Sequence, residues 1–285
     1  MVYYCADDYG ISGMSNRRIA ECVENGALNK ISVLPNGEID DWEYVLSQSK
    51  AELSLHINLV EGIPLSDKKN VGILLSDSGT FKYSFIGLLV LSISRKRKEL
   101  EKALYNELKS QVRWWKRVVG DRPILIDSHQ HTHMIPLVFR TLMKVLKDEG
   151  VIIKYLRIPQ EPIIPYLLTP SLYFTYNPVN IIKQSLLNFF ALVNTKEIKK
   201  GNISAPYCMG ILFSGKMDEK RVSKLLPKYI NYAKRNKKEV ELVFHPGYLE
   251  SDEEMMKGIR NDFEKFYYSP WRKVEFDTLK NLKHK

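Results

Sequence analysis

The chain has 285 residues, of which 44% are hydrophobic and 27% are charged, and these proportions fit a globular protein and exclude a disordered or fibrous one. Its formal net charge of +10 arises in lysine-rich stretches with helical periodicity. We assign this charge to solvated helix faces, because no phosphate loop, zinc finger or RNA-binding signature indicates a nucleic-acid partner. Cys5, Cys22 and Cys208 are too widely spaced for a CxxC motif and suit a reducing compartment.

The N-terminal sequence MVYYCADDYGIS has neither the basic start nor the apolar stretch of a secretory signal. We therefore expect a cytoplasmic protein. The most apolar segment, Phe85 to Ile93, is far shorter than the roughly 20 residues that cross a bilayer. No membrane span and no membrane partner are expected.

Apolar runs and amphipathic stretches alternate along the chain. In chain order they predict strand 2–6, helix 17–25, strand 31–35, strand 53–59, helix 95–119, strand 124–127, helix 138–149, strand 152–158, helix 221–235, strand 240–244 and a closing helix. Strands that alternate with helices at this spacing form a mainly parallel sheet. We predict an α/β fold with residues 1–285 as one domain, a (β/α) barrel with variable insertions around 66–100 and 162–200.

Five of the six histidines fall in three short segments, LSLHINLVEGIP, LIDSHQHTHMIP and LVFHPGY. Each segment begins as a predicted strand and places its histidines at the carboxyl end, where parallel α/β folds have their active sites. Asp7 and Asp8 follow the first strand at the equivalent position. A lone histidine is more often structural than a ligand, but this many polar groups between apolar neighbours indicate a metal or a polar network.

One carboxylate and two neutral imidazoles can hold a divalent metal and leave positions open for water and substrate. Asp8, His56 and His129 can supply this set, and such mixed ligands accept magnesium, zinc, manganese or cobalt. Of two adjacent acids, one can bind the metal while the other accepts a proton from the attacking water, and we assign the proton to Asp7. The alternative is that Asp7 and Asp8 form a helix N-cap or an Asx-turn.

The DSHQHTH sequence is interpreted as an extended strand or near-extended loop. In that conformation Asp127, His129 and His131 point to the same side. His131 or His133 can then contact the metal ligands or bind the substrate.

Three further polar residues are assigned to substrate binding. Arg157 and Glu161 can orient sugar hydroxyls, although an Arg–Glu pair near a strand end is about as often a structural ion pair. Asn58, in the segment that contains His56, completes the predicted substrate-binding set.

Six motifs carry a resemblance to a known family. They are ADDYGIS at 6–12, HINLVEGIP at 56–64, DSHQHTHMIP at 127–136, LRIPQE at 156–161, GILFSG at 210–215 and ELVFHPGY at 241–248. In order and spacing the chain resembles the YdjC-like carbohydrate deacetylases, a family that includes chitooligosaccharide deacetylases. The first motif departs from the usual NADDFG, since CADDYG stands here after only four residues. The segments 66–100 and 162–200 match no family pattern, and substrate specificity would lie there.

The resemblance implies a (β/α) barrel, often irregular, related to the polysaccharide deacetylases and the wider glycoside hydrolase-deacetylase superfamily. It implies an Asp-His-His site for one divalent metal, Mg or Zn, and Asp8, His56 and His129 fall on those positions. It also implies Asp7 as the catalytic base and His245 as the general acid for the leaving amine. Which of Asp7 and Asp8 binds the metal stays open.

The residues and the resemblance together predict a metal-dependent hydrolase that removes acetyl groups from N-acetylated sugars or oligosaccharides. One alternative keeps the metal but changes the substrate to another amide or a phosphoester, and acetate release distinguishes the two. The other is a non-enzymatic protein that binds an anionic polymer with salt-dependent affinity. The family and the apolar residues of 162–200 favour a homodimer.

Overall fold

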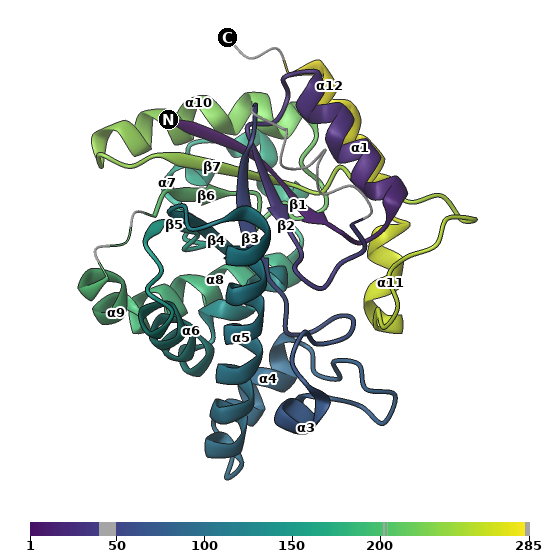
Figure 1. The fold of residues 1–285 in the computed structure, drawn as a ribbon. Coiled ribbons are helices and arrows are strands. Elements are labelled where there is room, and N and C mark those ends of the chain that lie inside the picture. The colour runs from purple at the N-terminus through teal and green to yellow at the C-terminus, as the bar shows by residue number, and fades with distance from the viewer. Residues whose placement is uncertain (40–49, 202, 204, 283–285) are drawn as a thin grey trace.

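The computed structural model describes residues 1–39, 50–201, 203 and 205–282. Within this part of the chain, seven parallel strands form one sheet in the order β5-β4-β3-β2-β1-β7-β6 (Figure 1). The strands are β1 (Val2–Tyr9), β2 (Lys30–Val33), β3 (Glu52–Ile57), β4 (Ile124–Ser128), β5 (Ile153–Leu156), β6 (Tyr207–Met209) and β7 (Val240–Phe244). Because the strands are parallel, their carboxyl ends meet on one side of the molecule.

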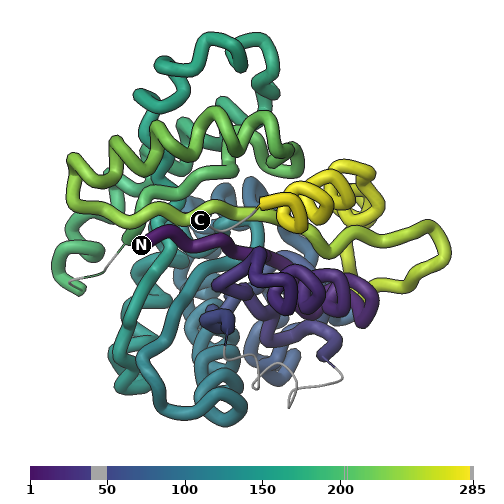
Figure 2. Tube along the Cα trace, turned by 90° about the horizontal axis from the view of Figure 1, so that it is seen from above, coloured from purple at the N-terminus to yellow at the C-terminus, as the bar shows by residue number. Residues whose placement is uncertain are grey.

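Helices surround this sheet, and the view from above in Figure 2 shows α12, near the C-terminus, lying beside α1, near the N-terminus. The α-helices are α1 (Gly13–Glu24), α3 (Lys68–Val71), α4 (Phe85–Ser92), α5 (Arg97–Val119), α6 (Pro136–Asp148), α7 (Ile164–Leu167), α8 (Pro178–Val193), α9 (Thr195–Lys200), α10 (Glu219–Arg235), α11 (Asn261–Tyr267) and α12 (Pro270–Asn281). Shorter 3-10 turns are η1 (Gly72–Leu74), η2 (His129–Met134) and η3 (Pro170–Thr175).

Local sequence explains where several of these elements begin and end. The side chain of Ser12 accepts the backbone N–H of Ser15 at 3.0 Å and so caps α1. Asp218 caps α10 in the same way. Helix α5 ends at Gly120, whose φ of +92° suits glycine. The strands β2, β4 and β7 are buried throughout, as expected for a parallel sheet covered on both faces.

The predicted α/β class and parallel sheet are confirmed, but the sheet is a half-barrel. Among the described residues no strand ladder joins the two edge strands, β5 and β6. One backbone hydrogen bond connects the two edges instead, from the N–H of Cys208 in β6 to the carbonyl of Gln160, just after β5, at 3.1 Å. The sheet is therefore closed by loops and side chains.

The predicted insertion around 66–100 contains α3, η1 and α4, and it packs on the core. Val71, Leu74 and Phe81 are buried there, so this segment is not purely polar surface. Within α4, Leu88 is buried while Val90 is exposed. One face of α4 thus packs on the core, and the opposite face is exposed.

The predicted insertion around 162–200 contains α7, η3, α8 and α9, and three asparagines of this segment hold it across the open side of the half-barrel. Asn180 donates to the carbonyl of Leu212, after β6, and Asn194 donates to the carbonyl of Met134, after β4. Between them, Asn188 exchanges hydrogen bonds with the backbone of Glu161, after β5. Helix α8 therefore bridges the loops that follow three strands.

In the part of the chain that the structure describes, no helix combines the length and the apolar character needed to cross a membrane. The 23-residue helix α5 is amphipathic: it buries a stripe that includes Leu104 and Leu108, while Lys98 and Arg113 are exposed. The length of α5 therefore reflects its buried apolar stripe, which covers the sheet.

Candidate metal centre

Asp7 and Asp8 are adjacent in β1, yet both carboxylates lie close to His56. In a regular strand neighbouring side chains face opposite sides. Here the pairing of β1 with β2 shifts register between Ala6 and Tyr9, and Asp8 has a φ of +71°. A bulge of this kind re-aims a side chain, and aspartate is among the few residues that tolerate a left-handed conformation. The bulge thus places two acids in one site.

Asp8, His56 and His129, which we call the ligand triad, offer ligand atoms that all lie within 4.8 Å of one another. They come from β1, β3 and the turn after β4, and all three are buried. Asp8 Oδ1 lies 2.9 Å from His129 Nδ1 and 3.6 Å from His56 Nε2. The structure therefore brings together the three residues predicted as metal ligands, and metal binding by them stays a prediction.

His56 is oriented as a metal-binding histidine would be. Its Nδ1 lies 2.6 Å from Asp127 Oδ1, while its buried Nε2 has no hydrogen-bond partner and faces Asp8. A carboxylate on one ring nitrogen commonly fixes the other toward a metal. Burial alone would lower the pKa of His56, but the carboxylates around it, Asp7 first, raise this pKa to about 9.

The other two members of the triad are suited to the same role. Burial opposes ionisation of Asp8, yet the charges of His129 and Arg272 hold the pKa of this carboxyl well below its usual value. Burial lowers the pKa of His129, against the attraction of Asp8. The triad thus offers an ionised carboxylate and an imidazole that favours its neutral form.

Below the triad, four buried residues form what we call the floor cluster: Lys30, Asp127, Arg157 and Glu241. Lys30 Nζ donates to Asp127 at 2.8 Å and to Glu241 at 2.7 Å. Arg157 donates to Glu241 through Nε and Nη2 and lies 3.2 Å from Asp127. Arg157 also forms a two-point ion pair with Asp7, at 2.7 and 2.8 Å. This predicted sugar-binding arginine is therefore engaged with three buried carboxylates.

The buried charges form one connected network with fewer cations than carboxylates. Its members are the carboxylates Asp7, Asp8, Asp127 and Glu241 and the cations Lys30, Arg157 and Arg272. The network is one positive charge short, and an uncompensated buried charge is costly. A proton on His56, or a cation held by the triad, supplies the missing charge. The donor set therefore fits a bound metal ion.

In the DSHQHTH sequence Asp127 and Ser128 end β4 and the residues from His129 on form the turn η2, so the predicted extended geometry is wrong beyond Ser128. Gln130 and His131 have φ values of +53° and +58°, and such strained backbone concentrates at functional sites. Nδ1 of His131 is buried without a hydrogen-bond partner. Burial, followed by the charge of Lys183 from α8, holds the pKa of His131 well below its usual value. His131 thus stays neutral with one ring nitrogen unused.

His133 and Asn58, both predicted to bind substrate, have internal partners. The two ring nitrogens of His133 contact the hydroxyl of Ser128 and the carbonyl of Arg157. The side-chain oxygen of Asn58 accepts two backbone N–H groups of its own loop, from Val60 and Glu61. Substrate contact by these two residues stays a prediction, and their observed contacts shape the loops.

Glu161, which was also predicted to bind substrate, joins the two edges of the half-barrel. Its carboxylate accepts the backbone N–H groups of Gly210, Ile211 and Leu212 at 2.7 to 2.9 Å. Gly210 has a φ of +128°, and a Cβ atom there would lie 2.8 Å from the carbonyl oxygen of Val243. The GILFSG motif therefore needs its first glycine for this close approach. Sugar binding by Glu161 also stays a prediction.

His245 follows β7 and lies at the exposed side of the site. Because Ala6 pairs with Phe244, Asp7 and His245 come next to each other on neighbouring strands. The backbone N–H of His245 donates to Glu275 in α12 at 2.6 Å, and its Nδ1 has no hydrogen-bond partner. With 20% of its side chain exposed, His245 is open to solvent while the triad is not.

The sequence interpretation missed two residues of the C-terminal helices. Arg272 in α12 donates to Asp8 Oδ2 at 2.6 Å, and the hydroxyl of Tyr267, at the end of α11, lies 3.3 Å from His129 Nε2. No motif marks them. Lys30, by contrast, had a signal, because a lysine at the head of an apolar strand is unusual unless it is paired.

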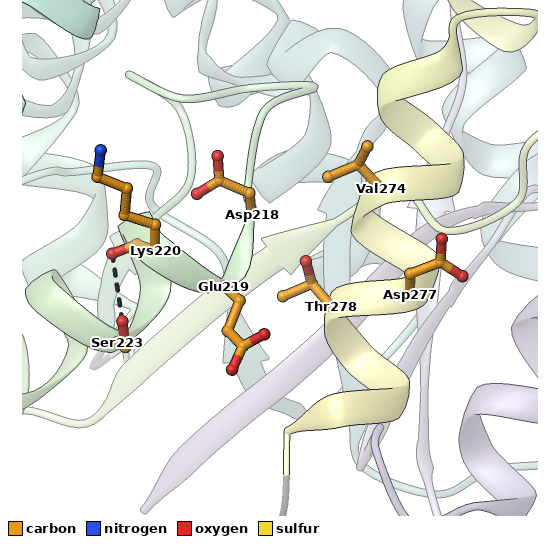
Figure 3. A pocket seen from close by; sticks show the side chains of 7 residues that line it. All are labelled: Asp218, Glu219, Lys220, Ser223, Val274, Asp277 and Thr278. Carbon is orange, nitrogen blue, oxygen red and sulfur yellow. Dashed lines mark hydrogen bonds between the residues drawn. The ribbon is translucent and has the colours of Figure 1, made fainter.

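A surface pocket between α10 and α12 lies apart from this site (Figure 3). Its lining residues are Asp218, Glu219, Lys220, Ser223, Val274, Asp277 and Thr278. None of them belongs to the predicted site, and Asp218 is already used as the cap of α10. The pocket therefore gives no alternative to the ligand triad.

Comparisons with known proteins identify a family and a shared fold. The model of the family described as YdjC-like protein matches residues 2–284. A carbohydrate deacetylase from Danio rerio is 33% identical over 159 residues, which are 55% of this chain and 49% of that protein, so the match spans about half the length of this curated relative. A crystal structure from Enterococcus faecalis V583, provisionally named a cellobiose-phosphate cleavage protein, shares the fold with a TM-score of 0.66 at 15% identity, covering 98% of this chain and 90% of that one.

Proposed function

Because this chain belongs to the YdjC-like protein family, we propose that it is a metal-dependent carbohydrate deacetylase. Its substrate would be an N-acetylated sugar or oligosaccharide, and the products would be acetate and a free amine. The name of the Danio rerio relative supports the substrate class. The observation that carries the metal is the buried, unpartnered Nε2 of His56 beside Asp8 and His129.

The ligand triad would hold one divalent ion, for which we propose Mg²⁺ or Zn²⁺. When bound, the ion supplies Lewis acidity toward a substrate carbonyl and a water molecule. The chain contributes the orientation of the ligands. Asp127 holds the ring of His56 at 2.6 Å, and Tyr267 contacts the far nitrogen of His129 at 3.3 Å. Such outer contacts fix the ring and tautomer of each histidine.

Asp7 is the residue that we propose as proton acceptor. Burial disfavours its charge, but the two-point contact with Arg157 outweighs burial and lowers the pKa of Asp7. The carboxylate is therefore ionised near neutral pH and held in a fixed orientation. A positioned, ionised carboxylate next to the ligand triad can take a proton from an attacking water.

His245 is the proposed proton donor to the leaving amine. It is adjacent to Asp7 across the β1–β7 pairing, and its Nδ1 has no hydrogen-bond partner. Its side chain is 20% exposed, so solvent can reach it between turnovers, as a general acid requires. Asp7 would thus accept a proton from the attacking water, and His245 would donate a proton to the leaving amine.

Among the predicted substrate-binding residues, His131 is the one that we propose for direct contact, because its Nδ1 is unused. Asn58, His133, Arg157 and Glu161 would act through the loops and side chains that they hold. Their polar groups are already occupied by the contacts described above.

The test is acetate release from N-acetylglucosamine and its short β-linked oligomers, with and without added Mg²⁺ or Zn²⁺ and with a chelated control. Asp7→Asn should reduce the rate by about 10²- to 10⁴-fold, the usual contribution of a positioned proton acceptor. Asp121→Asn is the matched control, since this aspartate side chain is 82% exposed, and its rate should not change.

Two outcomes would contradict the proposal. Acetate release that survives complete chelation would remove the metal from the mechanism. A chain that binds metal but releases no acetate from these substrates would be a hydrolase of another amide or of a phosphoester.

A further inference from the structure

Arg272 is held in one position by contacts through all three of its guanidinium nitrogens. Its Nε donates to the carbonyl of Phe266 at 3.0 Å and its Nη1 to the carbonyl of Gly247 at 3.4 Å. The guanidinium carbon lies 4.5 Å from the centre of the Tyr267 ring. The third nitrogen, Nη2, donates to Asp8 Oδ2 at 2.6 Å. The side chain is 6% exposed, so it cannot easily move aside.

This contact divides the two oxygens of Asp8. Oδ1 faces both histidines of the triad, at 2.9 Å from His129 and 3.6 Å from His56. Oδ2 is occupied by Arg272. A metal ion at the triad can therefore receive one oxygen from Asp8, and the second oxygen is withheld.

The number of oxygens matters because divalent ions differ in what they accept. Ca²⁺ takes six to eight oxygen ligands and often binds both oxygens of a carboxylate, whereas smaller ions such as Mg²⁺ and Zn²⁺ take fewer ligands at shorter distances. A site with one carboxylate oxygen and two imidazoles is poor for Ca²⁺. Withholding Oδ2 makes it poorer.

Tyr267 contacts the triad in a different way. Its hydroxyl lies 3.3 Å from His129 Nε2, and the Phe263 ring packs edge-on against the same imidazole at 5.6 Å. These contacts orient His129 so that its Nδ1 faces Asp8. They do not touch either oxygen of Asp8, so they should affect all ions alike.

We propose that Arg272 is a positioning residue that confines Asp8 to one ligand oxygen and thereby makes the triad select small divalent ions over Ca²⁺. This inference rests on the proposed metal site and adds what determines its selectivity. The C-terminal helices α11 and α12 would then tune the metal centre, although they carry none of its ligands.

The experiment measures the dissociation constants of Mn²⁺ and Ca²⁺ for the full-length chain by competition with a chromophoric chelator. For Arg272→Met, the ratio of the Ca²⁺ constant to the Mn²⁺ constant should fall by about tenfold, the lower end of the range for outer contacts of metal ligands. The ratio is the informative quantity. Loss of the arginine's positive charge strengthens the binding of both divalent ions, and this shared effect cancels.

Two variants serve as controls. Tyr267→Phe should weaken both ions by about tenfold and leave the ratio unchanged. Arg18→Met removes another arginine with the same kinds of contact. Arg18 contacts the carbonyl and the ring of Tyr248 and the carboxylate of Glu253, but no residue of the triad. It should change neither constant. If Arg272→Met is unfolded without metal, Arg272→Gln, which is smaller and uncharged, replaces it, with the same expected fall in the ratio.

The outcomes separate this inference from the proposed function. Wild-type chain that binds Mn²⁺, loses it on Asp8→Asn, and keeps its ion ratio on Arg272→Met would overturn the role of Arg272 and leave the metal site standing. Wild-type chain whose Mn²⁺ binding is absent or insensitive to Asp8→Asn would overturn the metal site itself.

Discussion

Two buried clusters of the half-barrel each contain groups that could hold a metal. The ligand triad combines Asp8 with two histidines, and beneath it Cys5, Asp127 and Glu241 also lie close enough together to hold a metal. They differ in what surrounds them. In the floor cluster Lys30 and Arg157 contact the carboxylates directly, whereas the triad leaves His56 Nε2 without a partner.

This difference shows that the residue types alone do not identify a metal site. An ammonium and a guanidinium already stand where a metal ion would be needed in the floor cluster, so its acids are satisfied within the chain. The triad keeps an unpartnered nitrogen in the same buried interior, which is costly unless something binds it. We infer that the floor cluster serves the fold and the triad serves function, and the predictions on Lys30 and Asp127 test this division.

The largest expected effect is on the floor cluster. Lys30→Met removes the ammonium that Asp127 and Glu241 share and leaves two buried carboxylates without it. Breaking a buried ion pair by removing one partner costs about 3–5 kcal/mol, so the free energy of unfolding should fall by that amount in urea titrations. Added Mn²⁺ should stabilise the variant at least as much as wild type, because the triad is untouched and the network has lost a positive charge.

Lys154→Met is the matched control for Lys30→Met. Lys154 also lies in a strand and pairs with an acid, Glu52, but its side chain is 50% exposed. An exposed pair contributes about 0–1 kcal/mol. Equal losses for the two lysine variants would mean that burial does not distinguish the floor cluster from a surface pair, and the comparison would fail.

Much of the fold could be predicted because its strands are buried on both faces. Such strands are continuous apolar runs, and the predicted strands at 124–127 and 240–244 correspond to Ile124–Ser128 and Val240–Phe244. The grouping of Asp8, His56 and His129 followed from a similar rule, since the carboxyl ends of parallel strands meet. Rules based on repeating geometry therefore located both the strands and the triad.

What the sequence could not predict depends on single tertiary contacts. The left-handed backbone of Asp8 and of Gln130–His131 breaks the strand pattern that was assumed for both. Arg272 lies 264 positions from Asp8 along the chain in an ordinary amphipathic helix, and no periodicity marks it as a partner. The open edge of the half-barrel likewise depends on single contacts, among them those of the Glu161 carboxylate with three backbone N–H groups.

The next largest effect concerns Glu61, a buried acid in the loop after β3. Burial raises the pKa of Glu61 to about 7, above its ordinary 4.5, although the N–H of Arg260 and the amide of Gln130 contact its oxygens. The folded chain then binds this proton more tightly than the unfolded chain does. Stability from this group is therefore present below about pH 4.5 and lost as pH rises through 7.

Glu61→Gln should remove that dependence. Between pH 4 and 8 the unfolding free energy of wild type relative to Glu61→Gln should fall by about 3 kcal/mol, from a shift of roughly 2.5 pKa units at 1.36 kcal/mol each. Urea titrations of both chains at several pH values give this difference, in which other titrating groups cancel. A difference that is constant with pH would show that the buried position of Glu61 tolerates the ionised carboxylate.

The smallest of the three effects, and the sharpest test of the division, is on Asp127, because this residue belongs to both clusters. It accepts from Lys30 at 2.8 Å with Oδ2 and contacts His56 Nδ1 at 2.6 Å with Oδ1. Asp127→Asn should weaken metal binding by about 10- to 100-fold, or about 1.4–2.7 kcal/mol, as for other carboxylates that orient a metal-binding histidine. Lys30→Met, which acts on the other oxygen and removes a positive charge from the network, should not weaken metal binding. If both variants weakened metal binding equally, the floor cluster would be part of the metal centre. The unpartnered nitrogen of His56 would then not distinguish the functional cluster from the structural one.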